Sequence, residues 1–277
     1  MTGEIMKLHH SISINYLSVI LALLLIVVSF SGVFTAEVYQ RETSSLAAQG
    51  VGQDIFDLFI IVPLLFILLI YSSRGARTAL FLLGGTVLYI MYSYFIYSFG
   101  IHFNSLFLFY CFTLGSSFYL FIIIIIEFIL KDVENWFEGN IPIKSTAAFF
   151  IIVAVMFYIL WFSDIIPAIL SNSVPSSVSN DNLMVNPVHV MDLAFILPGM
   201  ILTAVLLIRK RRLGIILTPI LLIFIIEMSL ALIAMALMLN IRNISADLSL
   251  IGIFGILTVI SVIFLILFFR RMKTRDA

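Results

Sequence analysis

The segment DLFIIVPLLFILLIYSSRGAR (57–77) recurs in the second half of the chain as DLAFILPGMILTAVLLIRKRR (192–212). Six of the 21 aligned positions are identical, and they include the Asp-Leu pair, the proline and the two arginines that end each segment. Each copy opens a long apolar run and closes with a basic turn. This pattern is typical of a membrane protein built from two repeated halves, which often meet at a functional site near the bilayer midplane.

The composition fits only a protein that uses lipid as its solvent. Apolar residues make up 62% of the 277 positions, charged residues only 11%, and the mean hydropathy is +1.21. A soluble domain of this size carries about 25% charged residues. The net charge is zero, so nothing favours a nucleic-acid partner. The single cysteine, Cys111, excludes an internal disulfide and a Cys-rich zinc site.

Eight apolar runs are long enough to cross the membrane, for which a helix needs about 20 residues. Each run must be helical because lipid cannot satisfy open backbone groups. We therefore expect an all-α polytopic membrane protein with two four-helix halves, residues 1–135 and 136–277. The expected spans are 14–35, 54–73, 78–99, 105–130, 146–168, 190–208, 214–239 and 247–269.

The placement of basic residues predicts the orientation. Of the 15 Lys and Arg residues, 13 fall on one side of the predicted spans, and only Arg41 and Arg242 fall on the other. We expect the protein to lie in the plasma membrane. The positive-inside rule then places both termini in the cytoplasm. Four spans return the chain to its starting side, so the halves should be parallel repeats. The two long outer connections, 36–53 and 169–189, are expected to be loops.

Glu227 is the sharpest functional candidate because it falls near the middle of the seventh span. A carboxylate at that depth is costly, and intramembrane acids are often functional. No basic residue lies at a matching depth, and the repeat counterpart of Glu227 is Tyr92. Tyr89 lies on the same helix face as Tyr92. We expect Tyr92 and Glu227 to meet across a central axis; the alternative is a purely structural, protonated Glu227 bonded to backbone or Ser229.

Asp57 and Asp192 are the repeated acids, and both are predicted near the outer ends of their helices. They could line an outer vestibule that attracts cations. The structural alternative is that each satisfies the free N–H groups at a helix N-terminus. Three prolines inside the spans are predicted to kink their helices. They are Pro63, Pro198 and Pro219.

The basic turns and the histidines have plainer interpretations. The arginines of the turns are expected to anchor the topology, with binding of anionic lipid headgroups as the alternative. These arginines are Arg74, Arg77, Arg209 and Arg212. Glu127 and Lys131 should form an i,i+4 ion pair. No histidine falls mid-span, and only His102 and His189 with Asp192 offer a weak metal alternative, so neither a metal nor a cofactor is expected.

The sequence favours transport over catalysis. Motifs of membrane-embedded enzymes, such as H-E-x-x-H and G-x-S-x-G, are missing. The first hypothesis is a small-solute or ion transporter or channel with its site between the halves. The alternative is a non-catalytic sensor or accessory subunit that binds lipid or a partner membrane protein. The expected partners are membrane lipids, a small solute or cation, and a partner membrane protein or a second copy of the chain.

Overall fold

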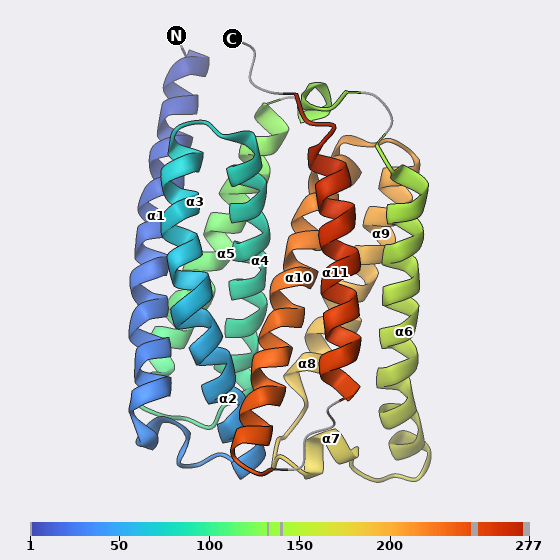
Figure 1. Cartoon of the computed structure of the whole chain (residues 1–277). Helices are drawn as coiled ribbons and strands as arrows, with labels where there is room; N and C mark the ends of the chain where they lie inside the picture. The colour runs from blue at the N-terminus through green and yellow to red at the C-terminus, as the bar shows by residue number, and fades with distance from the viewer. Residues whose placement is uncertain (1, 132, 139–140, 245–248, 274–277) are drawn as a thin grey trace.

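The computed structural model describes residues 2–131, 133–138, 141–244 and 249–273 of the chain. Within these residues it contains eight helical segments that are long and apolar enough to cross a membrane, so the chain is a multi-pass integral membrane protein. The predicted number and order of spans are confirmed. Both described ends of the chain lie at one end of the bundle (Figure 1); we call it the terminus end and the opposite one the loop end. Asp247, the first charged residue of the expected eighth span, and Arg275, one of the basic residues that predict the orientation, lie outside the described residues.

Residues 2–138 contribute four of the eight spans. The second span is a single rod made of α2, η2 and α3, and α4 and α5 follow it. The bounds are α1 (Thr2–Phe34), η1 (Ala36–Tyr39), α2 (Ser44–Phe56), η2 (Asp57–Ile61), α3 (Val62–Ser73), α4 (Arg77–Gly100), α5 (Phe107–Leu130) and η3 (Val133–Trp136).

Residues 141–273 contribute the other four spans. Here the sixth span is the rod made of α8, η4 and α9. The bounds are α6 (Ile143–Leu170), α7 (Ser176–Ser179), α8 (Pro187–Met191), η4 (Asp192–Ile196), α9 (Leu197–Ile208), α10 (Arg212–Ile241) and α11 (Ser249–Phe269).

The connection 36–53 is not the loop that we expected. Helix α2 begins at Ser44, where the Thr43 side chain accepts a hydrogen bond from the Leu46 N–H at 3.2 Å and so caps the helix. The second span is therefore 30 residues long and runs from Ser44 to Ser73. Its first turns are rich in Gly, Gln and Ser, so hydropathy alone does not reveal the start of the helix.

Both repeated Asp-Leu segments form a π-helical turn. In η2 the Val62 N–H bonds to the Asp57 carbonyl, and in η4 the Leu197 N–H bonds to the Asp192 carbonyl. Such i→i−5 turns are rare, and they are often found at functional sites. Pro63 and Pro198 each follow directly, in the first turn of α3 and α9. Proline lacks an N–H, so it fits the place where the α-helical bonding pattern resumes. Pro219 lies inside α10, which is a single helix in spite of it.

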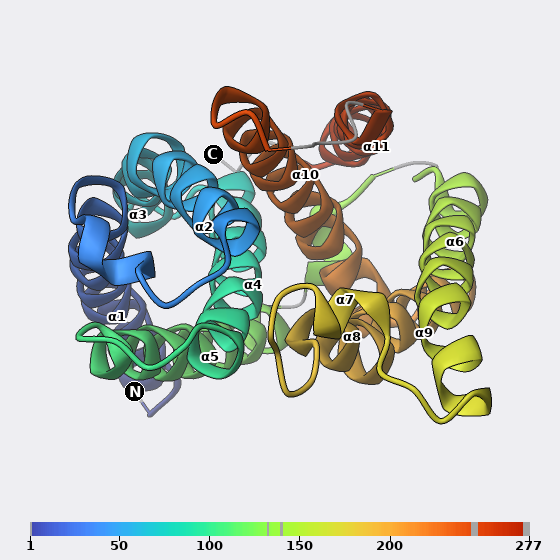
Figure 2. The same cartoon turned by 90° about the horizontal axis from the view of Figure 1, so that it is seen from below.

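Helices α4 and α10 lie at the centre of the bundle and are the two most buried spans (Figure 2). They approach closely at Gly84 and Gly85, which face Ile220 and Ile223 of α10. Small residues let helix backbones come together in this way. Helix α11 packs against α10 at the periphery and is the least buried span.

Candidate functional site

Four buried acids from four different elements face hydroxyl groups of the central helix α4. Each acid has at most 7% of its surface exposed. None of them forms an ion pair with a basic side chain in the part of the chain that the structure describes. The pairs are Asp54 with Tyr97, Asp57 with Tyr89, Asp192 with Tyr92 and Glu227 with Thr86. Helix α4 therefore gathers all four carboxyl groups around one axis of the bundle.

Asp57 lies well inside its span, which begins at Ser44, rather than at the N-terminus. Its Oδ1 accepts a hydrogen bond from the Tyr89 hydroxyl at 2.7 Å, and its side chain is fully buried. Thr43 performs the capping role that we considered for this acid. Asp57 is thus an internal acid held by α4.

Asp192 is held by two aromatic donors from two helices. Its Oδ1 accepts from the Tyr92 hydroxyl at 2.9 Å, and its Oδ2 accepts from the Trp161 Nε1–H of α6 at 2.8 Å. The N-terminus of α8 is capped by Asn186 instead, whose side chain accepts from the Val188 N–H. Here too the capping interpretation is wrong. The carboxyl group crosslinks α4, α6 and η4.

We expected Glu227 to meet Tyr92, but the two side chains have different partners. Its Oε1 lies 2.7 Å from Thr86 Oγ1, while Thr86 Oγ1 also lies 3.0 Å from the Leu82 carbonyl oxygen. A hydroxyl has one proton to donate. With an ionised Glu227 the Thr86 hydroxyl must share its one proton between the two oxygens, whereas a protonated Glu227 can donate to Thr86 and leave it free to donate to Leu82. Oε2 has no hydrogen-bond partner within the described residues. The partner is neither backbone nor Ser229, which the structural alternative named, and a neutral Glu227 stays a prediction.

A protonated Glu227 should be visible by infrared spectroscopy. We expect the purified protein at neutral pH to show a carboxylic-acid C=O band that shifts in heavy water. The band should be absent from Glu227→Gln, whose amide N–H can still donate to Thr86, so folding should be retained. Glu37→Gln, at an exposed acid outside the spans, is the control and should leave the band unchanged. An identical spectrum for Glu227→Gln would show that Glu227 is ionised.

The cluster around Asp54 escaped the sequence analysis. Tyr39 donates a short hydrogen bond to Asp54 Oδ2, and the Tyr97 hydroxyl lies 3.3 Å from Asp54 Oδ1. Burial, followed by the charge of Asp54, raises the pKa of Tyr39 well above its usual value, so this phenol stays a donor at neutral pH. Asp54 and Asp57 stand one helical turn apart, a spacing that could have revealed the cluster. The expected loop over 36–53 concealed that spacing.

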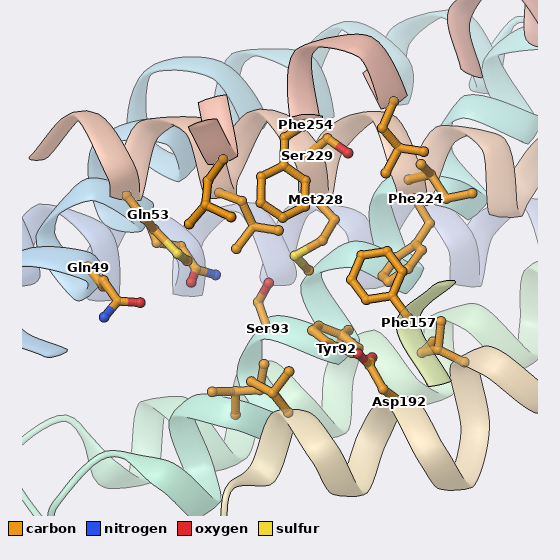
Figure 3. Close-up of a pocket in the computed structure, with 18 of the residues that line it drawn as sticks. Gln49, Gln53, Tyr92, Ser93, Phe157, Asp192, Phe224, Met228, Ser229 and Phe254 are labelled. Atoms are coloured by element: carbon orange, nitrogen blue, oxygen red, sulfur yellow. Dashed lines mark hydrogen bonds between the residues drawn. The ribbon is translucent and has the colours of Figure 1, made fainter. Parts of the chain in front are cut away.

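A cavity of about 370 Å³ lies beside this row of acids. Its walls come from α2, α4, α6, α8, η4, α9, α10 and α11, and they are mostly apolar. Asp192, Tyr92 and Trp161 line it, whereas Asp57, Tyr89 and Glu227 do not. In Figure 3, Asp192 and Tyr92 lie side by side, with Phe157 and Phe224 on the same side of the cavity and Gln49 and Gln53 on the other.

The basic residues of the turns divide into two kinds. Arg77 lies over the Trp136 ring at 5.0 Å, and Arg212 donates to the Ile129 carbonyl at 2.9 Å, so both contact protein groups. Arg74 and Arg209 are exposed at the terminus end. Of the four arginines considered, this second pair is the better placed for lipid headgroups.

The remaining polar candidates form local pairs. Lys131 Nζ lies 2.6 Å from Glu127 Oε1, which confirms the predicted i,i+4 ion pair. His102 Nδ1 lies 2.9 Å from Glu42, and the His189 ring packs against Trp161 with centroids 4.6 Å apart. The described residues contain no group of three or more His, Cys, Asp or Glu side chains that could hold a metal ion.

Comparisons with protein-family models, with curated proteins and with solved structures give no match for this chain. Its function must therefore be inferred from the geometry of the site.

Proposed function

We propose that this protein is a non-catalytic binding protein, a sensor or accessory subunit, for an amphipathic molecule dissolved in the membrane. The cavity carries the proposal. It has the size of a small-ligand site, about 300–1,000 Å³, and combines an apolar wall with a few convergent polar groups. Asp192, Tyr92 and Trp161 supply those polar groups. A membrane-dissolved molecule with an apolar tail and a polar head matches both parts of the wall.

The position of the cavity supports access from the lipid. Helices α6 and α11 both line it, and they are the two least buried spans. They carry residues such as Phe157 and Phe254 on its wall. A ligand that reaches the cavity between two peripheral helices need not cross water.

Two repeated halves are part of the proposal. The π-helical turns begin at Asp57 and Asp192, the first residues of the two aligned segments. The turns after α3 and α9 also match, because Gly75 (φ 79°) and Lys210 (φ 51°) are both left-handed and occupy equivalent positions in that alignment. One difference weighs against the duplication: α1 and α5 pack together, whereas among the described residues their counterparts α6 and α11 make few contacts and both line the cavity. An experimental structure in which 14–130 fails to superpose on 149–265 would contradict the duplication. In this proposal the cavity lies where the two halves meet, since α2 and α4 of the first half and helices of the second half line it.

We propose a plasma-membrane orientation with both termini in the cytoplasm. The basic side chains Arg74, Arg77, Arg209 and Arg212 support it, since all four lie in turns at the terminus end. Single cysteines at Glu37 and Arg209, in a Cys111→Ser background, test it in intact cells. A membrane-impermeant maleimide should label only the residue at the loop end. Labelling of Arg209→Cys alone would invert the topology.

Ligand binding can be measured at Trp161, which lines the cavity. The chain has two tryptophans, so Trp136→Phe leaves Trp161 as the sole emitter. In maltoside micelles we expect brominated decanol to quench Trp161, and unbrominated decanol to restore the emission by competition. Brominated decanol that is merely dissolved in the micelle occupies no defined site, so added decanol would not displace it and the quenching would not saturate.

Blocking the cavity should remove the competition. Leu257 of α11 lines the cavity, while its neighbour Ile256 is 64% exposed on the outer side of the same helix. We expect Leu257→Phe to weaken the competition and Ile256→Phe to leave it unchanged. If decanol reverses the quenching neither in the Trp136→Phe protein nor in its two variants, binding in the cavity is refuted.

Transport of a small solute or ion is the second candidate. The observation that favours it is the pair of π-helical turns, since such turns often mark functional sites, each at a buried acid. Glu227 lies outside the cavity wall, which weakens the site first expected from the sequence. The test is the flux of a solute into vesicles that contain the protein. If Asp57→Asn abolishes this flux and leaves the binding measured at Trp161 unchanged, transport is favoured.

A further inference from the structure

We propose that the ligand of the cavity carries a positively charged, ammonium-type headgroup, which Asp192 and the surrounding aromatic rings recognise. This inference rests on the proposed binding function and adds the charge of the ligand to it. Four features carry it: the hydrogen bonds of Asp192, the missing basic partner, the aromatic faces and the apolar remainder of the cavity.

The hydrogen bonds of Asp192 suit an ionised carboxylate. Each of its two oxygens receives one donor, the Tyr92 O–H on Oδ1 and the Trp161 N–H on Oδ2. A carboxylate only accepts hydrogen bonds, and here each oxygen accepts one and keeps capacity for a further donor. Glu227 is different, because its contact with Thr86 is satisfied by a protonated acid. The two acids therefore have different roles in one bundle.

No basic side chain among the described residues forms an ion pair with Asp192. Both of its donors are neutral groups, so the negative charge is oriented but not compensated. A charge in apolar surroundings is costly unless it is paired. A cationic ligand would supply the pair from the cavity side, where Asp192 forms part of the wall.

Aromatic rings share the cavity wall with the carboxylate. Tyr92, Phe157, Trp161 and Phe224 all line the cavity with Asp192. The Tyr92 and Phe224 ring centroids are 5.4 Å apart, and those of Phe157 and Trp161 are 6.1 Å apart. The faces of such rings attract alkylammonium groups, and clusters of them recognise quaternary ammonium ligands. Figure 3 shows three of these rings beside Asp192.

The apolar remainder of the cavity disfavours two other kinds of cation, a metal ion held by protein ligands and a small hydrated cation. A metal ion needs several oxygen or nitrogen ligands, and the described residues contain no group of three or more His, Cys, Asp or Glu side chains that could hold one. A small hydrated cation would have to lose its water against apolar walls. An organic cation with an apolar tail meets neither obstacle, since Leu257, Phe254 and their neighbours can cover the tail.

The test uses three probes with the same tail and different heads. Decyltrimethylammonium, decanol and decyl sulfate compete with brominated decanol for the quenching of Trp161 in the Trp136→Phe protein. We expect the cation to compete at a concentration about tenfold lower than decanol, and the anion to compete worst. Asp192→Asn should remove most of the preference for the cation over decanol and leave only the part that the aromatic rings supply. Phe157→Leu, which removes a ring and keeps the carboxylate, should reduce the preference in part.

Asp57→Asn is the matched control, because Asp57 occupies the equivalent π-helical turn and is bonded to a tyrosine but lies outside the cavity wall. It should leave the preference for the cation intact. Equal competition by all three probes in the parent protein would refute the inference while leaving the binding function standing. Competition by none of them would refute both. A preference for the cation that is as large in Asp192→Asn as in the parent protein would also overturn the assignment to this carboxylate.

Discussion

Gly85→Ala is expected to lower the free energy of unfolding by about 1–3 kcal/mol, the usual cost of overpacking a close contact. A Cβ at this position would overlap Ile223 Cβ and Cγ2 and would lie 3.0 Å from the Ile220 carbonyl oxygen. These are branched or backbone atoms that cannot rotate away. The central contact between α4 and α10 would therefore have to open. Unfolding in a denaturing detergent, followed by circular dichroism, measures the change.

Two other glycines serve as controls for Gly85. At Gly84 an added Cβ would lie 3.3 Å from the end of the Ile220 side chain, which can move, so Gly84→Ala should cost less. At Gly115 nothing lies within 4 Å, so the better helix propensity of alanine should leave Gly115→Ala neutral or more stable by up to about 1 kcal/mol. Ile223→Ala should rescue part of the Gly85→Ala loss. Equal effects at all three glycines would show that the contact is not tight.

Asp54→Ala is expected to destabilise the protein by about 2–5 kcal/mol, because removing a buried acceptor costs about 1–3 kcal/mol for each donor left unpaired. Tyr39 would lose Asp54 and keep only the long contact of 3.3 Å to the Tyr97 hydroxyl, while Tyr97 would keep the Gly50 carbonyl at 3.3 Å. A void would also open beside Gly32, over which the carboxyl group lies. The loss of thermal stability in micelles measures the effect.

A double-mutant comparison separates the hydrogen bond from the void. In a Tyr39→Phe protein the hydroxyl that donates to Asp54 is already absent, so Asp54→Ala should cost less there than in the parent. Glu37→Ala removes an exposed acid at the same end of the bundle and should be nearly neutral. Losses of the same size for Asp54→Ala and Glu37→Ala would contradict the buried role of Asp54.

The spans were predictable from the sequence because hydropathy and length alone decide which segments lipid can accept. The start of α2 was not, since Gln49, Gly50, Gly52 and Gln53 resemble a polar connection. In the structure Gln53 and Gly52 are buried against neighbouring helices instead. A polar stretch can therefore continue a span when other helices cover it.

The acids of the site were predictable, but their partners were not. Asp57, Asp192, Tyr89, Tyr92 and Glu227 stood out because polar groups are rare in apolar runs. The pairing of acids with hydroxyls depends on how far each helix is rotated about its axis and shifted along the membrane normal. Hydropathy gives no information on either quantity. The repeat also pointed to the wrong pair, since Tyr92 and Glu227 occupy equivalent places but contact Asp192 and Thr86.

The π-helical turns have a consequence for how this chain can change its length. A π turn holds one residue more than the regular helix, and each residue of a regular helix adds about 100° of rotation. The wide turn absorbs the extra residue, so the segments before and after it keep their angular phase. Loss of one residue between Asp57 and Pro63, or between Asp192 and Pro198, would restore a regular helix without turning its inner half. These two places are thus where the rods tolerate a one-residue deletion that would elsewhere rotate a buried face out of register.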